Sequence, residues 1–163
     1  MRLATTSFII SIVFVSLAGA QSYSSEEQEI VDRTISQWKN YAEGNYDAMV
    51  TGPPDLVGIQ ASSHGGLWDT ATAEEQLNNL RQTPYTLRAT PYHIQILFLG
   101  SDKDVAYVAY YLSGSVTLED GTVVDSYRTR ASEILERING QWVSRGAHYS
   151  KLHEGSGIPS PTN

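Results

Sequence analysis

Cysteine is absent from all 163 residues of the sequence. No disulfide can therefore cross-link the chain, and no thiolate can serve as a nucleophile or as a ligand of zinc or of an iron–sulfur cluster. The histidines are not spaced as metal ligands either; they are His64, His93, His148 and His153. A glycine-rich phosphate-binding motif is also missing. We therefore expect neither a metal nor a cofactor.

Basic residues are scarce. Eleven lysines and arginines stand against eighteen acidic residues, which gives a formal net charge of −7. The sequence has no basic cluster that could neutralise phosphate groups. We therefore expect no nucleic-acid partner and no attraction to anionic membranes.

A single long apolar run is present, at the N-terminus. Phe8–Leu17 follows Arg2 and precedes the small residues Ala18–Ala20. This pattern is typical of a signal peptide over residues 1–20, cleaved before Gln21. The run is shorter than the roughly 20 residues that cross a bilayer, so a transmembrane anchor is the less favoured alternative.

The chain after the predicted cleavage site has the length of one domain, which we place at residues 21–152. Residues 153–163 are rich in glycine, serine and proline and predict a disordered tail. Loss of Arg2 changes the formal charge from −7 to −8. We expect a soluble, secreted or periplasmic protein with no membrane contact after cleavage.

Helical patterns occupy the first part of this domain. Apolar residues at helical spacing follow Ser24, with Glu27 placed for a capping box, and they stop at Gly44. A second helix is expected in "TAEEQLNNLRQ", with Thr72 as its cap. Between them, "NYDAMV" predicts a helical turn and "DLVGIQ" a short strand.

Strand patterns dominate after Pro84. Four segments rich in β-branched and aromatic residues are separated by short turns, and the last turn, Asn139-Gly140, is typical of a hairpin. Consecutive strands with short turns form an antiparallel meander. Helices followed by such strands predict an α+β domain in which the helices pack on one face of a curved antiparallel sheet.

Several segments resemble the nuclear transport factor 2-like superfamily over residues 25–152. The matching words are "WKNYAEGNYDAM", "PDL", "HIQILFLGSDKDVAYVAY", "DG" and "SYRTRASEILERINGQWVSRGAHYS". The superfamily includes ketosteroid isomerase, scytalone dehydratase and the SnoaL cyclases, and the nearest resemblance is to the calcium/calmodulin-dependent protein kinase II association domain and to secreted relatives. The resemblance implies a cone-shaped α+β fold whose cavity is lined by the C-terminal motifs, namely Arg130-x-Ser132, Trp142 and His148-x-Ser150.

Two positions differ from the kinase association domain. Glu133 stands where that domain has an arginine in its long third strand, and Leu112 where it has another in its second strand. Its arginine pocket is therefore not expected intact. We expect no kinase module, since the sequence has no glycine-rich nucleotide loop.

Alternation along the last two strands predicts a pocket. Trp142 and His148 share one face of the last strand, and Arg130 lies on one face of its hairpin partner. If both faces are the concave ones, Arg130 and His148 meet inside the cone. We then expect a ligand pocket bounded by Trp38, Tyr41, Arg130, Trp142 and His148.

His148 is the candidate catalytic residue, because imidazole titrates near neutral pH and can act as a general base. It could instead be a buried neutral histidine that is hydrogen-bonded to Ser150 or to a helix carbonyl and closes the cone. Arg130, if buried, requires an acid or an anionic ligand. The acids that could pair with it are Asp125, Glu133, Glu136 and an acid of the first helix. His64, in a glycine-rich loop, could contact a ligand at the mouth of the cone or be solvated.

Aromatic residues form a further constellation, made up of Trp38, Tyr41, Tyr46, Trp68, Tyr92, Tyr107, Tyr110 and Tyr111. Their rings could line an apolar cavity, or they could belong to the core or to a dimer interface. No carboxylate stands out as a catalytic base, because Asp47, Asp55 and Asp69 fall at helix ends or in loops. Both faces of "VAYVAYYL" are apolar, which predicts a homodimer or a larger homo-oligomer.

Three functions agree with these patterns. The first is a secreted domain that binds a small apolar or anionic ligand or assembles, without catalysis. The second is an enzyme of the SnoaL or ketosteroid isomerase type that moves a proton on a small apolar substrate. The third is a purely structural oligomeriser.

Overall fold

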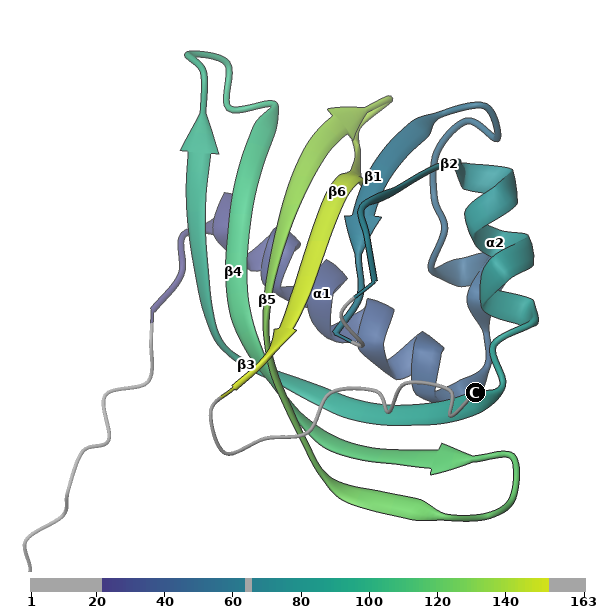
Figure 1. The fold of residues 1–163 in the computed structure, drawn as a ribbon. Helices are drawn as coiled ribbons and strands as arrows, with labels where there is room; N and C mark the ends of the chain where they lie inside the picture. The colour runs from purple at the N-terminus through teal and green to yellow at the C-terminus, as the bar shows by residue number, and fades with distance from the viewer. Residues whose placement is uncertain (1–21, 64–65, 153–163) are drawn as a thin grey trace, which may run out of the picture.

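The computed structural model describes residues 22–63 and 66–152 (Figure 1). Its elements are, in order, α1 (Ser25–Glu43), a 3₁₀ helix η1 (Tyr46–Ala48), β1 (Val57–Ala61), β2 (Asp69–Thr72), α2 (Ala73–Arg81), β3 (Tyr85–Leu99), β4 (Val105–Leu118), β5 (Val123–Ile138) and β6 (Gln141–Lys151). The predicted signal peptide, His64 and the predicted tail with His153 lie outside the described residues. No helix of the described part is long and apolar enough to cross a membrane.

Both helices begin at the capping boxes that the sequence predicts. The Ser24 hydroxyl accepts from the Glu27 N–H at 3.3 Å, and the Glu27 carboxylate accepts from the Ser24 N–H at 2.8 Å. Thr72 and Glu75 form the same pair at the start of α2. Helix α1 ends at Gly44, whose φ of 72° is left-handed.

The six strands form one sheet in the order β2-β1-β6-β5-β4-β3. Strands β3 to β6 are the predicted antiparallel meander, and φ is positive at both Asn139 and Gly140 in its last turn. Strand β1 pairs in parallel with β6, so the whole sheet is mixed. The short, polar strand β2 was not predicted, because four residues with two threonines and no large apolar side chain carry no clear alternation.

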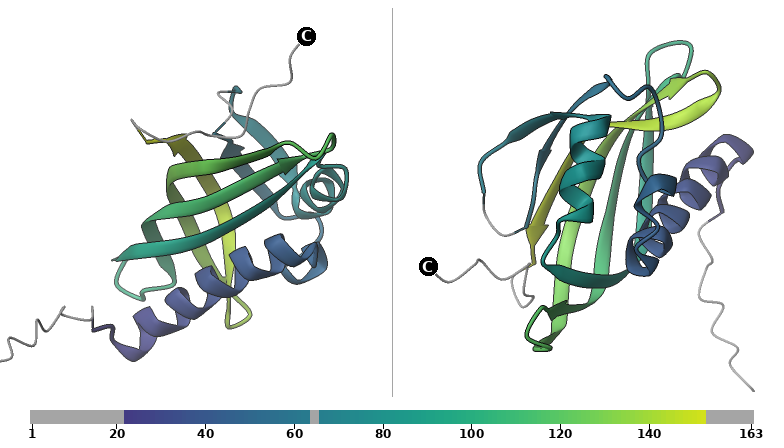
Figure 2. Two further views of the ribbon diagram at one scale, coloured as in Figure 1. Left: turned by 90° about the horizontal axis from the view of Figure 1, so that it is seen from below. Right: turned by 90° about the vertical axis from the view of Figure 1, so that its right-hand side faces the viewer.

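The helices and the sheet form the predicted α+β arrangement. Helix α1 crosses the concave face of the sheet, and α2 stands beside β1 and β2 (Figures 1 and 2). The buried residues of α1 pack against this face; they are Ile30, Val31, Thr34, Trp38 and Tyr41. We call this face the inner face and the opposite one the outer face.

Burial distinguishes the two faces of the central strands. In β4 the inner face carries Ala106, Val108, Tyr110 and Leu112, all buried. In β5 it carries Tyr127, Thr129, Ala131, Glu133 and Leu135, also buried. One of these, Glu133, is charged, although it lies between Ala131 and Leu135 and only 1% of it is exposed.

Candidate functional site

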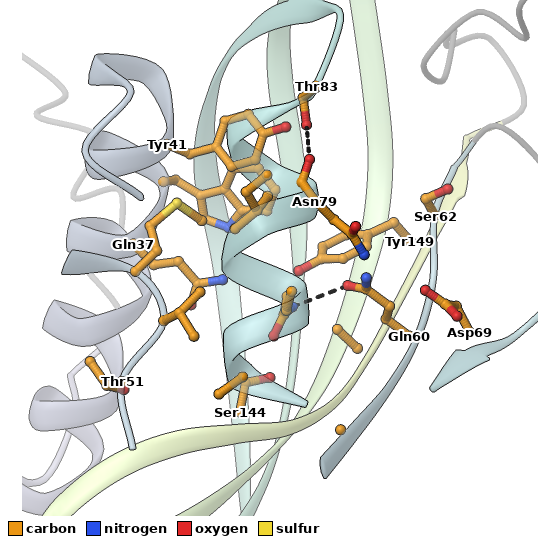
Figure 3. A pocket seen from close by; sticks show the side chains of 18 of the residues that line it. Gln37, Tyr41, Thr51, Gln60, Ser62, Asp69, Asn79, Thr83, Ser144 and Tyr149 are labelled. Atoms are coloured by element: carbon orange, nitrogen blue, oxygen red, sulfur yellow. Dashed lines mark hydrogen bonds between the residues drawn. The ribbon is translucent and has the colours of Figure 1, made fainter. Parts of the chain in front are cut away.

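A cavity of about 390 Å³, here called the main cavity, opens between α1, α2 and the inner face of the sheet (Figure 3). Its aromatic lining residues are Trp38, Tyr41, Tyr85, Tyr127 and Tyr149. Trp38 and Tyr149 meet edge to face at 5.7 Å between ring centroids. A cavity of this size with ring-bearing walls fits a small organic molecule.

Amide side chains form another part of the wall. Gln60 of β1 and Asn79 of α2 point into the cavity from the side of Tyr149, while Gln37 of α1 faces them (Figure 3). Gln76 Nε2 donates to Gln60 Oε1 at 3.2 Å. These amides can both donate to and accept from a neutral ligand.

A buried polar network lies beneath the rings. Arg33 Nη1 of α1 contacts Glu133 Oε2 at 2.9 Å, and the Tyr110 hydroxyl donates to Glu133 Oε1. Trp38 Nε1 in turn donates to the Tyr110 hydroxyl oxygen at 3.0 Å. Each oxygen of the buried carboxylate therefore has a partner.

Two tyrosine hydroxyls next to this carboxylate are held in the protonated form. Burial, and after it the negative charge of Glu133, raises the pKa of Tyr110 well above its ordinary value. The same two causes, in the same order, raise the pKa of Tyr149. Tyr149 lines the main cavity, and its neutral hydroxyl is hydrogen-bonded to Tyr110.

Few ionisable side chains face the main cavity among the described residues. Glu133 does not line the main cavity, and its charge is compensated by Arg33. Asp69 does line it, but from the exposed strand β2. No histidine of the described residues is among the lining side chains. Among the described lining residues, Asp69 is thus the one carboxylate that could act as a general base towards a ligand.

The structure brings together only part of the predicted pocket. Trp38 and Tyr41 line the main cavity, as expected. Trp142 is buried next to it and lines an adjoining chamber. Arg130 and His148 lie on the outer face, where both are exposed and line a separate groove. The prediction that they face the cone is wrong; whether they bind a ligand stays untested.

A β-bulge explains the error for His148. Ile134 pairs with Gly146, but the next residue, Leu135, pairs with Ser144, so Arg145 is an extra residue in β6. Beyond the bulge the alternation changes phase, and Tyr149 rather than His148 faces inward.

Arg130 belongs to the outer phase of β5. Its Nε donates to Ser150 Oγ at 2.8 Å. Two of the acids considered as its partners have other cations: Glu133 pairs with Arg33, and Glu136 pairs with Arg145. Arg130 is therefore not the buried cation that the sequence suggested.

The network residues Arg33, Tyr110, Glu133 and Tyr149 were not predicted as a site. The sequence did contain a signal for Glu133. Because side chains alternate along a strand, Glu133 lies on the same face as Ala131 and Leu135, which is the apolar face. A charged residue in an apolar phase must have a buried partner. The sequence alone did not show that Arg33 is that partner, 100 residues away.

Comparison with known proteins supports this architecture. No protein-family model and no curated protein matches the chain. A solved structure of an NTF2-like protein from Cytophaga hutchinsonii is 15% identical, has a TM-score of 0.61, and covers 79% of this chain and 100% of its own. The chain has the nuclear transport factor 2-like fold.

Two further structures share the nuclear transport factor 2-like fold. The association domain of Caenorhabditis elegans CaMKII is 17% identical with a TM-score of 0.57, covering 78% of this chain and 96% of its own. A Catenulispora acidiphila protein in complex with S-DNPA is 17% identical with a TM-score of 0.59, covering 77% and 92%. At these identities the likeness shows the fold alone.

Proposed function

We propose that this domain binds a small, neutral, ring-containing molecule in the main cavity and does not transform it. The observation that carries the proposal is the combination of an aromatic and amide lining with a buried carboxylate that is already paired with Arg33. An anionic ligand is less favoured, because Arg33, the one cationic side chain of the described lining, is compensated by Glu133.

Proteins of the same fold support a binding function and an assembly function. The Catenulispora protein was solved in complex with S-DNPA, and the CaMKII domain is an association domain. We propose that this chain combines the two, with the ligand in the main cavity and a second copy of the chain on the outer face.

An enzyme that transfers a proton is the second candidate. It is favoured by the contact of a carboxylate with a tyrosine hydroxyl, Glu133 with Tyr110, close to the cavity. A substrate would have to reach past Arg33 and displace it from Glu133, which makes this function the weaker of the two.

Naphthalene, a neutral two-ring probe, tests binding directly. We expect calorimetry and thermal melts to show that it binds and stabilises the protein. Ala147→Phe, which fills the main cavity from β6, should abolish that binding. Ala109→Phe adds the same volume on the outer face and should leave binding unchanged. Equal affinity for both variants would contradict a ligand site in the main cavity.

We also propose that the domain acts outside the cytoplasm, secreted or periplasmic. The support is the pattern of residues 1–20, with an apolar run and small residues before Gln21. N-terminal sequencing of the protein from its native host should give Gln21 as the first residue. Recovery of Met1 on a membrane-bound product would overturn this proposal.

A further inference from the structure

A second hollow adjoins the main cavity. This side chamber has a volume of about 260 Å³. It shares four lining residues with the main cavity, namely Arg33, Gln37, Met49 and Thr51. Its other lining residues are Ser36, Asn40, Ala48, Gln141 and Trp142. The four shared residues therefore stand where the two hollows adjoin.

Two buried polar atoms without a hydrogen-bond partner belong to this chamber. Among the described residues, Gln37 Oε1 and Trp142 Nε1 are the buried side-chain atoms that have none. One is an acceptor and the other a donor, and both residues line the side chamber. An unpaired buried polar group costs about 1–3 kcal/mol. Two such groups at one hollow require a partner that the described side chains do not supply.

The Trp142 ring cannot easily turn its N–H elsewhere. The Arg137 guanidinium carbon lies 4.4 Å from the centroid of the Trp142 ring. The centroid of the Phe98 ring lies 6.1 Å from that of Trp142. The indole is 6% exposed. Packing of this kind fixes the direction of the donor.

We propose that the side chamber is a subsite for a hydroxyl group of the ligand, so that the molecule bound in the main cavity is a neutral ring compound carrying an alcohol or a phenol. A hydroxyl can accept from Trp142 Nε1–H and donate to Gln37 Oε1. If the Gln37 carboxamide turned over and presented its NH₂, the hydroxyl could accept from that group as well. A carboxylate could not donate to Gln37.

This subsite rests on the proposed binding function, and a matched pair of probes separates the two. Naphthalene reports on the main cavity alone, and 2-naphthol adds one hydroxyl to the same rings. Water solvates that hydroxyl, so a pocket without partners for it would bind 2-naphthol more weakly. We expect 2-naphthol to bind about tenfold more tightly than naphthalene.

Trp142→Phe keeps a ring between Arg137 and Phe98 but removes the indole N–H. It should lower the affinity for 2-naphthol about tenfold and leave that for naphthalene unchanged. Gln37→Met removes the acceptor at similar length and should act in the same way, which covers the case of a Trp142 variant that folds poorly. Trp68→Phe deletes an indole N–H at an exposed position outside both hollows and serves as the control.

The indole N–H signal gives a second readout. In the ¹⁵N spectrum, 2-naphthol should shift the Trp142 Nε1–H resonance downfield, and naphthalene should shift it less. If the two probes bound with equal affinity to the wild-type protein and to Trp142→Phe, the hydroxyl subsite would be overturned. Water would then be the partner of the two unpaired atoms. The proposed binding function would still stand. Binding of neither probe up to its solubility limit would overturn both.

Discussion

Glu133 shows how one side chain shapes this cavity. It lies on the inner face of β5 with 1% of its surface exposed, and it takes Arg33 from α1 and Tyr110 from β4 as partners. Its pairing ties the helix to two strands beneath the main cavity. The same pairing occupies the carboxylate that a catalytic mechanism would need.

Removal of Arg33 should destabilise the fold, because it leaves the buried Glu133 carboxylate without its counter-charge. Arg33→Met is expected to lower the free energy of unfolding by about 3 kcal/mol at neutral pH. Glu133→Gln in the same chain should recover most of that loss, since it removes the stranded charge. Urea unfolding of the single and double variants measures both effects.

A surface pair provides the control. Arg81 and Asp47 are 2.6 Å apart, but about half or more of each side chain is exposed. Arg81→Met should change the free energy of unfolding by less than about 1 kcal/mol. If Arg33→Met cost no more than Arg81→Met, the buried pair would not be a stabilising feature.

The buried tyrosines predict a loss of stability at alkaline pH. Folding raises the pKa of Tyr110 and of Tyr149, so below about pH 10 both states carry the protons and stability is independent of these groups. Above that pH the unfolded chain loses protons that the folded chain keeps. Each group should then lower the free energy of unfolding by about 1.4 kcal/mol per pH unit.

Urea unfolding at a series of alkaline pH values measures this slope. Tyr149→Phe removes one of the two groups and should make the slope shallower. During an alkaline titration, tyrosinate absorbance should rise together with the loss of circular dichroism. Complete ionisation of the tyrosines in a protein that still had its native dichroism would contradict the prediction.

At the scale of the elements, the pairing of β3 with β4 depends on Gly114. A methyl group placed there would lie 1.9 Å from the carbonyl oxygen of Arg88 and 2.7 Å from Cα of Ala89. The two strands thus approach more closely than any other residue allows. The strands carry Leu87 and Leu112, which are buried in the core beneath this contact.

Gly114→Ala should separate the strands and lower the free energy of unfolding by about 1–3 kcal/mol. Gly146→Ala is the matched control, because its methyl group would meet only the Ile59 carbonyl oxygen at 3.5 Å. That change should stay within about 0.5 kcal/mol. Thermal or urea unfolding of the two variants measures this difference in stability. Equal stabilities would show that the strands can separate without a loss of folding free energy.

At the scale of the whole molecule, the outer face carries a row of apolar side chains across neighbouring strands. Ile59 pairs through Gly146 with Ile134, which pairs with Tyr107, which pairs with Leu97. These four side chains are between 40% and 59% exposed. A contiguous apolar row of this kind is typical of an interaction surface.

We expect this row to hold a second copy of the chain, so that the protein is at least a dimer. Ile134→Glu should dissociate it, because the charge would be buried at the contact. Val123→Glu changes an equally exposed apolar residue outside the row and should have no effect. Sedimentation at micromolar concentration measures the mass, and a monomeric wild-type protein would contradict the prediction.

The sequence by itself determined both helices and the four long strands of the meander in their order, but not the short strand β2. Local signals were sufficient to place both helices and the antiparallel meander. These signals are the helix caps Ser24, Gly44 and Thr72 and the Asn139-Gly140 turn, each of which affects only residues a few positions away. They also predicted the α+β fold. Trp38 and Tyr41 were assigned to the cavity correctly, because a helix has only one apolar face to bury.

The tertiary structure alone decided which strand residues face the cavity. The extra residue in β6, Arg145, exists only as a mismatch against β5, so alternation along one strand could not show that Tyr149 replaces His148 on the inner face. Likewise, the contact of Arg33 with Glu133 joins α1 to β5 across 100 residues. Such pairings depend on how the elements pack, because a side chain's partner is set by distance in space and not by distance along the chain.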